Sequence, residues 1–346
     1  MTSITLQRPS PRKPQHKQWI AADISRLDKP LLCVNIDTEE EFDWTKPFSR
    51  DNTSVRSVKY LHRAQTIFKS YGVKPCYLID YPIAADPYAC EVLQLWADEG
   101  DCLVGAQLHP WVTPPHEEVV CPYNSYPCNL PSDLERRKIR ILTETIEASV
   151  GVRPTIYKAG RYGIKLKRIW ALAEEGYEVD TSVVPYKSYA GLGGGPDFFG
   201  YPDQPFWPDA DETRVMCLPV TQSLVGVMRD AGRRGLGRVV FGRDGIKFRL
   251  PGLFSRLGLL ERIMLSPEGV SVDAMRRLVD GMIDDGKRVF ALSFHSPSLQ
   301  TGRTPYVRSE EELSEFLYRI EAMIDYILTD KGGAPATPLE IKTVLS

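Results

Sequence analysis

The sequence predicts an α/β fold in which about seven parallel strands alternate with helices and form a (β/α) barrel. Short apolar runs alternate with longer stretches that carry apolar residues at helical spacing. Seven such runs fit within about 270 residues, which suits a barrel of fewer than eight repeats. Polar, titratable residues follow almost every run. A doubly wound open sheet is the alternative, and no internal repeat separates the two.

Seven segments are predicted as strands because they are short, apolar and rich in β-formers, as strands buried on both faces are. They are residues 31–36, 75–79, 102–108, 155–158, 178–183, 215–220 and 289–294.

Four helices are predicted from apolar residues at helical spacing, over 54–71, 134–150, 272–283 and 313–327. Ser132 followed by Glu135 predicts a capping box at the start of the second helix, and Gly151 a stop at its end. Gly286 closes the third helix in the same way.

The two ends of the chain differ in composition from its middle. Residues 1–29 are polar, basic and contain prolines, which predicts a disordered or loosely attached arm. Residues 331–346 look like a tail whose last apolar segment could dock back. The folded part is expected at 30–330, with inserted loops at 185–212 and 229–265.

Composition limits the classes of function. The 346 residues are 42% hydrophobic and 25% charged with a formal net charge of -2, so nothing global suggests nucleic-acid binding. Seven cysteines are scattered without a CxxC pair, and no apolar stretch of about 18 residues exists. We therefore expect a location in the cytoplasm.

The segment 31–44, LLCVNIDTEEEFDW, is the most informative of the chain. Its apolar run ends in five carboxylates within seven residues, which are Asp37, Glu39, Glu40, Glu41 and Asp43. Crowded carboxylates repel one another unless a cation, a proton or a substrate relieves them. Ligands of α/β folds bind at this end of the strands.

Other polar or titratable groups follow the remaining predicted strands. They are Asp80, His109, Lys158 with Arg161, Asp180, Thr221 and His295. Their convergence on one rim is the pattern of an active site. Carboxylates with histidine suit Zn²⁺ or a similar divalent ion, and equally a metal-free pair of base and acid.

Five motifs occur in the order known from one protein family. IDTEEEFDW, GAQLHPW, YKAGRYG, YEVDTSV and LSFHSPSL resemble motifs of the polysaccharide deacetylases (NodB homology, carbohydrate esterase family 4). The FHSPSL–TPYV stretch is most similar to a bacterial subgroup linked to surface-polysaccharide and cell-wall synthesis. The resemblance implies a distorted (β/α)7 barrel and removal of an N-acyl group, usually N-acetyl, from an amino sugar.

The resemblance also implies roles for particular residues. Asp37 would be the general base and His295 the general acid. Lys158 falls on the family's strand-four arginine, with Arg161 three residues later. A divalent metal, Zn²⁺ by expectation, would be held by Asp37, Glu39 or Glu40, and His109. Gln107 and Trp111 stand where the family has its histidine pair, so His109 is offset.

Aromatic residues are the candidates for binding a sugar, because their faces stack on apolar C–H faces. We expect Trp111, Tyr306 and Trp207 in this role, the last from the aromatic loop 185–208. That loop could equally form a small core of its own.

Residues 229–249 hold seven basic residues against two aspartates, followed by the apolar stretch 253–265. Contact with an anionic substrate handle or with a membrane surface over 229–265 is one interpretation, and a solvated insertion is the other.

The leading prediction is a metal-assisted deacetylase that acts on an amino-sugar-containing small molecule or glycan. A metal-free C–N hydrolase of amides or ureides and a catalytically silent carbohydrate-binding relative are the alternatives.

Overall fold

The computed structural model describes residues 19–43, 45–208 and 215–346. Its centre is a sheet in which seven strands run parallel in the order β11-β2-β3-β4-β5-β6-β8. The strands are β2 Leu31–Thr38, β3 Cys76–Ile79, β4 Leu103–Leu108, β5 Ile156–Ala159, β6 Val179–Asp180, β8 Met216–Cys217 and β11 Val289–His295. Each coincides with one of the seven predicted segments, so the predicted strands are confirmed.

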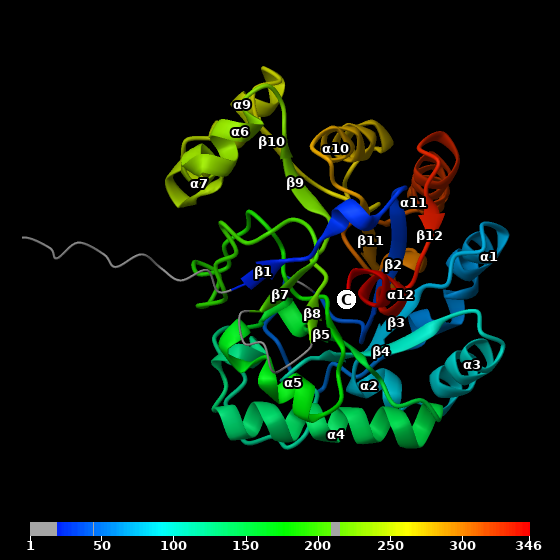
Figure 1. Cartoon of the computed structure of the whole chain (residues 1–346). Coiled ribbons are helices and arrows are strands. Elements are labelled where there is room, and N and C mark those ends of the chain that lie inside the picture. The colour runs from blue at the N-terminus through cyan, green and yellow to red at the C-terminus, as the bar shows by residue number, and fades with distance from the viewer. Residues whose placement is uncertain (1–18, 44, 209–214) are drawn as a thin grey trace, which may run out of the picture.

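The sheet curls into a barrel with helices around it (Figure 1). Within the described residues no ladder joins β8 to β11. Side chains close this seam, together with backbone bonds from Leu265 N to Thr221 O at 2.8 Å and from Ser293 N to Leu265 O at 3.2 Å. Gln204 Oε1 accepts the backbone N–H groups of Arg288 and Val289 at 3.1 and 3.0 Å, and its Nε2 donates to Val289 O at 2.9 Å. Thr221 Oγ1 accepts the N–H of Ala291 at 2.7 Å. The predicted distorted barrel is confirmed, and this seam is the distortion.

Helices cover the outside of the sheet. They are α1 His62–Ser70, α2 Tyr81–Ala84, α3 Pro87–Asp98, α4 Ser132–Val150, α5 Trp170–Glu174, α10 Val272–Asp284 and α11 Glu310–Asp325. All four predicted helices are present, the first preceded by a 3-10 turn at Arg56–Tyr60. The capping box is wrong, because α4 begins at Ser132 itself and Glu135 pairs with Arg168 at 2.7 Å. Gly151 ends α4 with a φ of 79°, as predicted.

Both ends of the described chain are packed, which corrects the predicted loose attachment for residues 19–29 and agrees with the docking expected for the last apolar segment. Residues 1–18 lie outside the described part, but β1 (Trp19–Ala21) pairs antiparallel with β7 (Phe206–Pro208). The strand β12 (Ala334–Pro335) pairs with β2, and α12 (Pro338–Leu345) follows it. In Figure 1, α12 lies over the middle of the barrel.

The period of two along each strand divides the core into an outer and an inner part. Outward residues such as Leu32, Val34 and Ile36 pack under the helices. Inward residues near the start of the strands, such as Cys33 and Ile156, form an apolar plug with α12. Two or four residues further along each strand, the same inward faces carry polar side chains that line the cavity described below, namely Asp37, Gln107, Lys158 and His295. The fold thus places an apolar plug at one end of the barrel and a polar site at the other.

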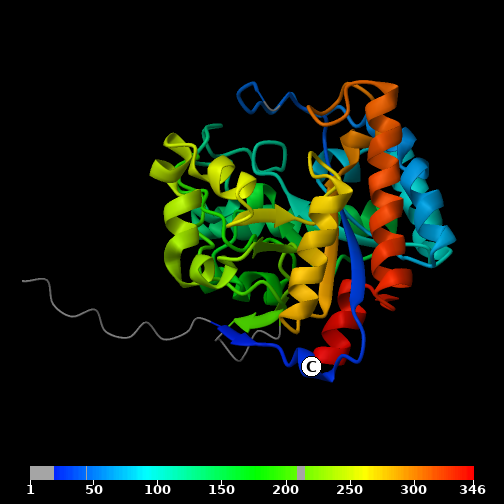
Figure 2. The same cartoon turned by 90° about the horizontal axis from the view of Figure 1, so that it is seen from above.

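The expected insertion at 229–265 forms a separate small unit. The hairpin of β9 (Gln222–Val225) and β10 (Glu261–Met264) carries four short helices, α6 Arg229–Ala231, α7 Gly237–Phe241, α8 Arg243–Lys247 and α9 Leu250–Arg256. Their own core is Tyr186, Leu224, Val240, Phe241 and Leu260. Figure 2 shows these helices, in yellow, on the side of the barrel away from α1 and α11. No described helix is both long and apolar enough to cross a bilayer.

Candidate active site

A cavity of about 410 Å³ opens at the carboxyl ends of the parallel strands. It brings together most of the residues predicted from the sequence, namely Asp37, Glu39, His109, Trp111, Lys158, Arg161, His295 and Tyr306. Glu40 and Trp207 are not among its lining residues. The predicted gathering of the acids near position 40 with the imidazoles at 109 and 295 is therefore present in the structure.

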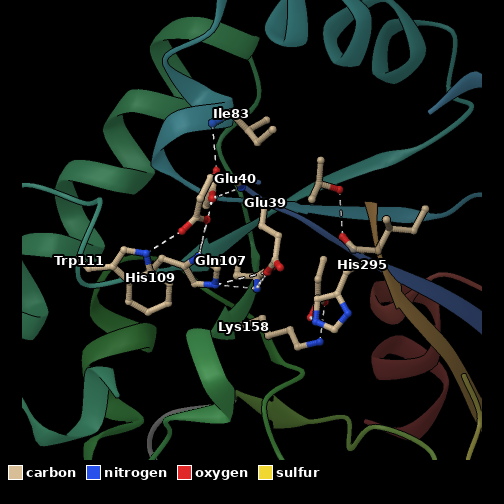
Figure 3. Close-up of polar contacts among 12 residues, drawn as sticks. Glu39, Glu40, Ile83, Gln107, His109, Trp111, Lys158 and His295 are labelled. Atoms are coloured by element: carbon tan, nitrogen blue, oxygen red, sulfur yellow. Dashed lines mark hydrogen bonds and ion pairs between the residues drawn. The ribbon is translucent and has the colours of Figure 1, made fainter. Parts of the chain in front are cut away.

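Asp37 lies at the end of β2 and contacts two basic groups. Its Oδ1 accepts a hydrogen bond from Lys158 Nζ at 2.5 Å, and its Oδ2 is 3.6 Å from His295 Nε2. The parallel register of β2 and β11 places Asp37 directly beside His295. Figure 3 shows Lys158 and His295 converging on one region of the pocket.

His295 is held by the carboxylate of Glu268, a residue that was not predicted from the sequence. Its Nδ1 lies 2.7 Å from Glu268 Oε2, and Glu268 Oε1 accepts the backbone N–H of His295 and the hydroxyl of Ser298. Burial opposes a charge on the ring, but the carboxylates of Glu268, Glu39 and Asp37 outweigh it and raise the pKa of His295 to about 10. With Nδ1 paired to Glu268, Nε2 faces Asp37. His295 is therefore a cationic acid at neutral pH.

A second, deeper group orients His109. Glu40 Oε2 is 2.7 Å from His109 Nδ1, and its Oε1 accepts Trp111 Nε1–H at 2.7 Å (Figure 3). The N–H of Glu40 donates to Asp80 Oδ2, and Asp80 Oδ1 caps α2 at Ile83 N. Burial raises the pKa of Glu40 to about 8 and that of Asp80 well above its usual range. Glu40 was predicted to bind metal, but both its oxygens are used in positioning His109 and Trp111.

The four predicted metal ligands do not form one group. Asp37 and Glu39 gather with His295, whereas Glu40 and His109 gather with Asp80; within each group, ligand atoms lie within 4.8 Å of one another.

Gln107 connects the two groups. Its Nε2 lies 3.0 Å from Glu39 Oε2 and 3.1 Å from His109 Nε2, and these last two atoms are 3.5 Å apart. Ligand atoms around a four-coordinate divalent ion lie about 3.3 Å apart, because the bonds measure about 2.0–2.2 Å. The spacing fits such an ion once the Gln107 amide is turned to present its oxygen, a turn that takes no extra space. His109 has the carboxylate partner typical of a metal-binding histidine.

The two basic candidates after β5 have separate partners. Lys158 contacts Asp37, and its Nζ also lies 5.0 Å from the centre of the Tyr162 ring. Arg161 lines the cavity, but its guanidinium donates to Ser125 Oγ and Leu192 O and covers the ring of Tyr126. Arg161 therefore joins the loops of the rim and does not contact Asp37.

The predicted sugar-binding aromatics also separate. Trp111 is only 1% exposed and is stacked on His109 with ring centres 4.4 Å apart, so it supports that ring. Tyr306 lines the cavity and is 37% exposed. The prediction that Trp207 binds the sugar in this cavity is wrong, because Trp207 lies in β7 opposite Ile20 and packs against the inner apolar cluster. Of the aromatic loop 185–208, Tyr189 reaches the cavity, together with Lys187.

Neither a family model nor a curated protein matches the chain. Solved structures do. A protein from Mycobacterium smegmatis that carries the provisional name polysaccharide deacetylase matches at 18% identity, with a TM-score of 0.52, over 92% of this chain and 91% of its own.

Peptidoglycan deacetylase PdaC from Bacillus subtilis matches at 12% identity over 92% of each chain, with a TM-score of 0.40. BA3943 from Bacillus anthracis, a CE4 family pseudoenzyme, matches at 10% identity over 91% of this chain and 66% of its own, also with a TM-score of 0.40. The first match shows that the chain has the fold of a polysaccharide deacetylase, and the TM-scores of the other two are too low to add to this.

Proposed function

We propose that this chain, which has the fold of a polysaccharide deacetylase, hydrolyses the N-acyl group, by expectation N-acetyl, of an amino sugar in a polysaccharide or its precursor. One observation carries the proposal. Asp37 and His295 face each other across 3.6 Å in an open cavity, and each is fixed from behind by an oppositely charged partner, Lys158 or Glu268. A base and an acid held this close can both transfer protons during the hydrolysis of one bound amide bond.

The proposed reaction uses the two atoms of this pair that face each other, Asp37 Oδ2 and His295 Nε2. Asp37 Oδ2 takes a proton from a water molecule whose oxygen attacks the acyl carbon. His295 Nε2 gives its proton to the amide nitrogen as the C–N bond breaks, which releases the carboxylic acid and the amine. Lys158 occupies Oδ1 of Asp37 and so leaves Oδ2 for the water. Glu268 keeps the proton on His295 until the amine leaves.

A divalent cation fits the neighbouring position. We assign it to Glu39, His109 Nε2 and the turned amide oxygen of Gln107, in place of the ligand set predicted from the sequence. When bound, it would polarise the acyl carbonyl and lower the pKa of a bound water. One imidazole with two oxygens is a harder ligand set than the histidine-rich sites typical of zinc.

The metal-free hydrolase remains the second candidate because of one contact. In the orientation seen, the Gln107 amide donates toward both Glu39 and His109 and so supplies hydrogen-bond donors where a cation would lie.

The cytoplasm stays our prediction for the location of the chain.

Release of acetate from a set of N-acetylated sugars tests the function. The set comprises free N-acetylhexosamine, a chitin oligomer and a nucleotide-linked N-acetyl sugar, each with added Zn²⁺, with added Mn²⁺ and with a chelator. We expect acetate from at least one of them. Binding of these sugars without any acetate release would favour the silent carbohydrate-binding relative, and full activity in chelator would favour the metal-free hydrolase.

A further inference from the structure

The inserted helices present large apolar side chains to solvent. Five of the sixteen exposed large hydrophobic residues of the described chain fall within residues 239–257. They are Val239, Ile246, Phe248, Leu253 and Leu257, exposed by 61%, 58%, 70%, 53% and 61%. Scattered exposed apolar residues are ordinary, but their concentration in one short segment indicates an interaction site.

The helix α9 shows why these side chains are not simply a loosely packed core. Leu250 and Phe254 pack inward on the small core of the insertion. Leu253 and Leu257, four residues apart, lie on another side of the same helix and remain exposed. A helix that is apolar on both sides is normally covered on both. The described residues cover only the inner one.

Charge in this segment is opposite to that of the rest of the chain. Residues 229–258 contain eight basic residues and two acidic ones, a net charge of +6, so the remainder of the chain carries -2 - 6 = -8. Arg229 and Arg233 pair with Asp285, and Arg238 pairs with Asp197. The other five form no ion pair with any described residue and are exposed; they are Arg234, Arg243, Lys247, Arg249 and Arg256.

The insertion is placed where a large flat surface can reach it. Figures 1 and 2 agree that α6, α7 and α9 stand outside the barrel, on the side opposite α1. Neither the neighbouring helices of the barrel nor α12 lies over them.

We propose that residues 239–257 dock on an anionic lipid surface. Phe248, Leu253 and Leu257 would enter the boundary between headgroups and acyl chains, while Arg243, Lys247 and Arg249 contact lipid phosphates. The mixture of exposed apolar and unpaired basic side chains selects this occupant. A second copy of this chain that docked through the same segment would bring the same positive charge and be repelled, and a neutral partner would leave the five basic groups without a counter-charge.

Sedimentation of the full chain with lipid vesicles tests the proposal. We expect binding to vesicles of phosphatidylcholine mixed with phosphatidylglycerol, and at least tenfold weaker binding to phosphatidylcholine alone. Salt should weaken the binding, because part of it is electrostatic. Absence of binding to the anionic vesicles, or equal binding to both kinds, would overturn the proposal.

Two sets of substitutions separate the contributions. Phe248→Ser with Leu253→Ser removes apolar contact, and Arg243→Gln with Lys247→Gln removes charge; each pair should weaken binding about tenfold or more. Leu95→Ser with Tyr318→Ser, exposed residues of α3 and α11, is the matched control and should bind as the unaltered chain does. Equal thermal unfolding shows that the variants fold. Unchanged binding of both test variants, or sedimentation equilibrium showing that this patch instead joins two copies, would contradict the proposal.

Discussion

The charge of Glu268 sets the pH at which His295 holds its proton. Glu268→Gln removes the largest favourable charge on the ring while burial still opposes it, so the pKa of His295 should fall from about 10. An acid must be protonated to act, so activity is present below its pKa and lost as the pH rises through it. The alkaline limb of kcat/KM should therefore move to lower pH by about one unit or more.

Glu261→Gln is the control for this change, because Glu261, on β10, pairs with Arg277 of α10 and does not line the cavity. A limb that stays in place in Glu268→Gln, or that moves equally in the control, would remove His295 from the role of acid.

Gln107 decides how well a metal is held. Gln107→His places a second imidazole beside His109 and Glu39, and imidazole is a better Zn²⁺ ligand than an amide oxygen. We expect Zn²⁺ to bind at least about tenfold more tightly, measured by calorimetry on the purified protein. Gln94→His, at an exposed position of α3, should not change the affinity. Unchanged affinity in Gln107→His would place the cation elsewhere or nowhere.

Single residues were predictable where a strand end determines them. Asp37, Lys158 and His295 follow apolar runs in the sequence, and the structure brings them together. Glu268 was missed because it follows β10, where no strand was predicted, 27 residues from its partner. Glu39 and Glu40 are adjacent, so their positions in the sequence do not tell which of them faces the cavity. In the structure Glu39 lines the cavity and Glu40 accepts a hydrogen bond from Trp111.

At the scale of elements, α4 holds the loop that carries His109. The ammonium of Lys138 is fully buried, donates to Pro110 O and Thr113 O, and lies 3.1 Å from Glu118 Oε2. Lys138→Met should lower the free energy of unfolding by about 3–5 kcal/mol, because a buried carboxylate loses its partner. Urea denaturation measures this. The intrinsic fluorescence of Trp111 should change as well, since the same loop positions it.

The adjacent Arg137 provides the comparison, because it pairs with Glu117 at the surface. Arg137→Met should cost less than about 1 kcal/mol. Equal costs for the two substitutions would show that the Lys138 contacts do not hold the loop.

Elements with one dominant pattern were predicted well, and mixed ones were not. The apolar runs of β2 and β11 leave no other interpretation than buried strands. The strand β9, with sequence QSLV, begins with two polar residues that are buried through hydrogen bonds to Pro185 and Asp203, and so carries no strand pattern. The box at Ser132 failed because Pro131, the preceding residue, takes the cap position.

For the whole molecule, the seam between β8 and β11 is the weak place of the barrel. Gln204 is 7% exposed and supplies three hydrogen bonds to the backbone of β11 and the residue before it. Gln204→Ala leaves those buried groups unpaired and should lower the free energy of unfolding by about 3 kcal/mol. Chemical denaturation checks this, with the exposed Gln94→Ala as control. A loss as small as in the control would mean that the seam is held by other contacts.

The packing of the N-terminal segment could not be predicted from local composition. Residues 19–29 follow a polar, basic stretch, yet Ala22 and Leu27 are buried in the inner cluster beside Ile341 and Leu345 of α12. The partner that buries each segment lies at the other end of the chain. Only the closed barrel brings them together.

The central claim is that Asp37 and His295 form the base and acid of one amide-hydrolysing site. The most direct measurement is the rate of acetate release by Asp37→Asn protein, on the sugar that the unaltered chain hydrolyses fastest. Asp43→Asn, an exposed change six residues along the same segment, is the control. The account predicts a loss of roughly a thousandfold in Asp37→Asn, in protein that still folds but is less stable because the buried Lys158 loses its partner, and near-normal activity in the control. A variant that keeps most of its activity while folding normally would contradict it.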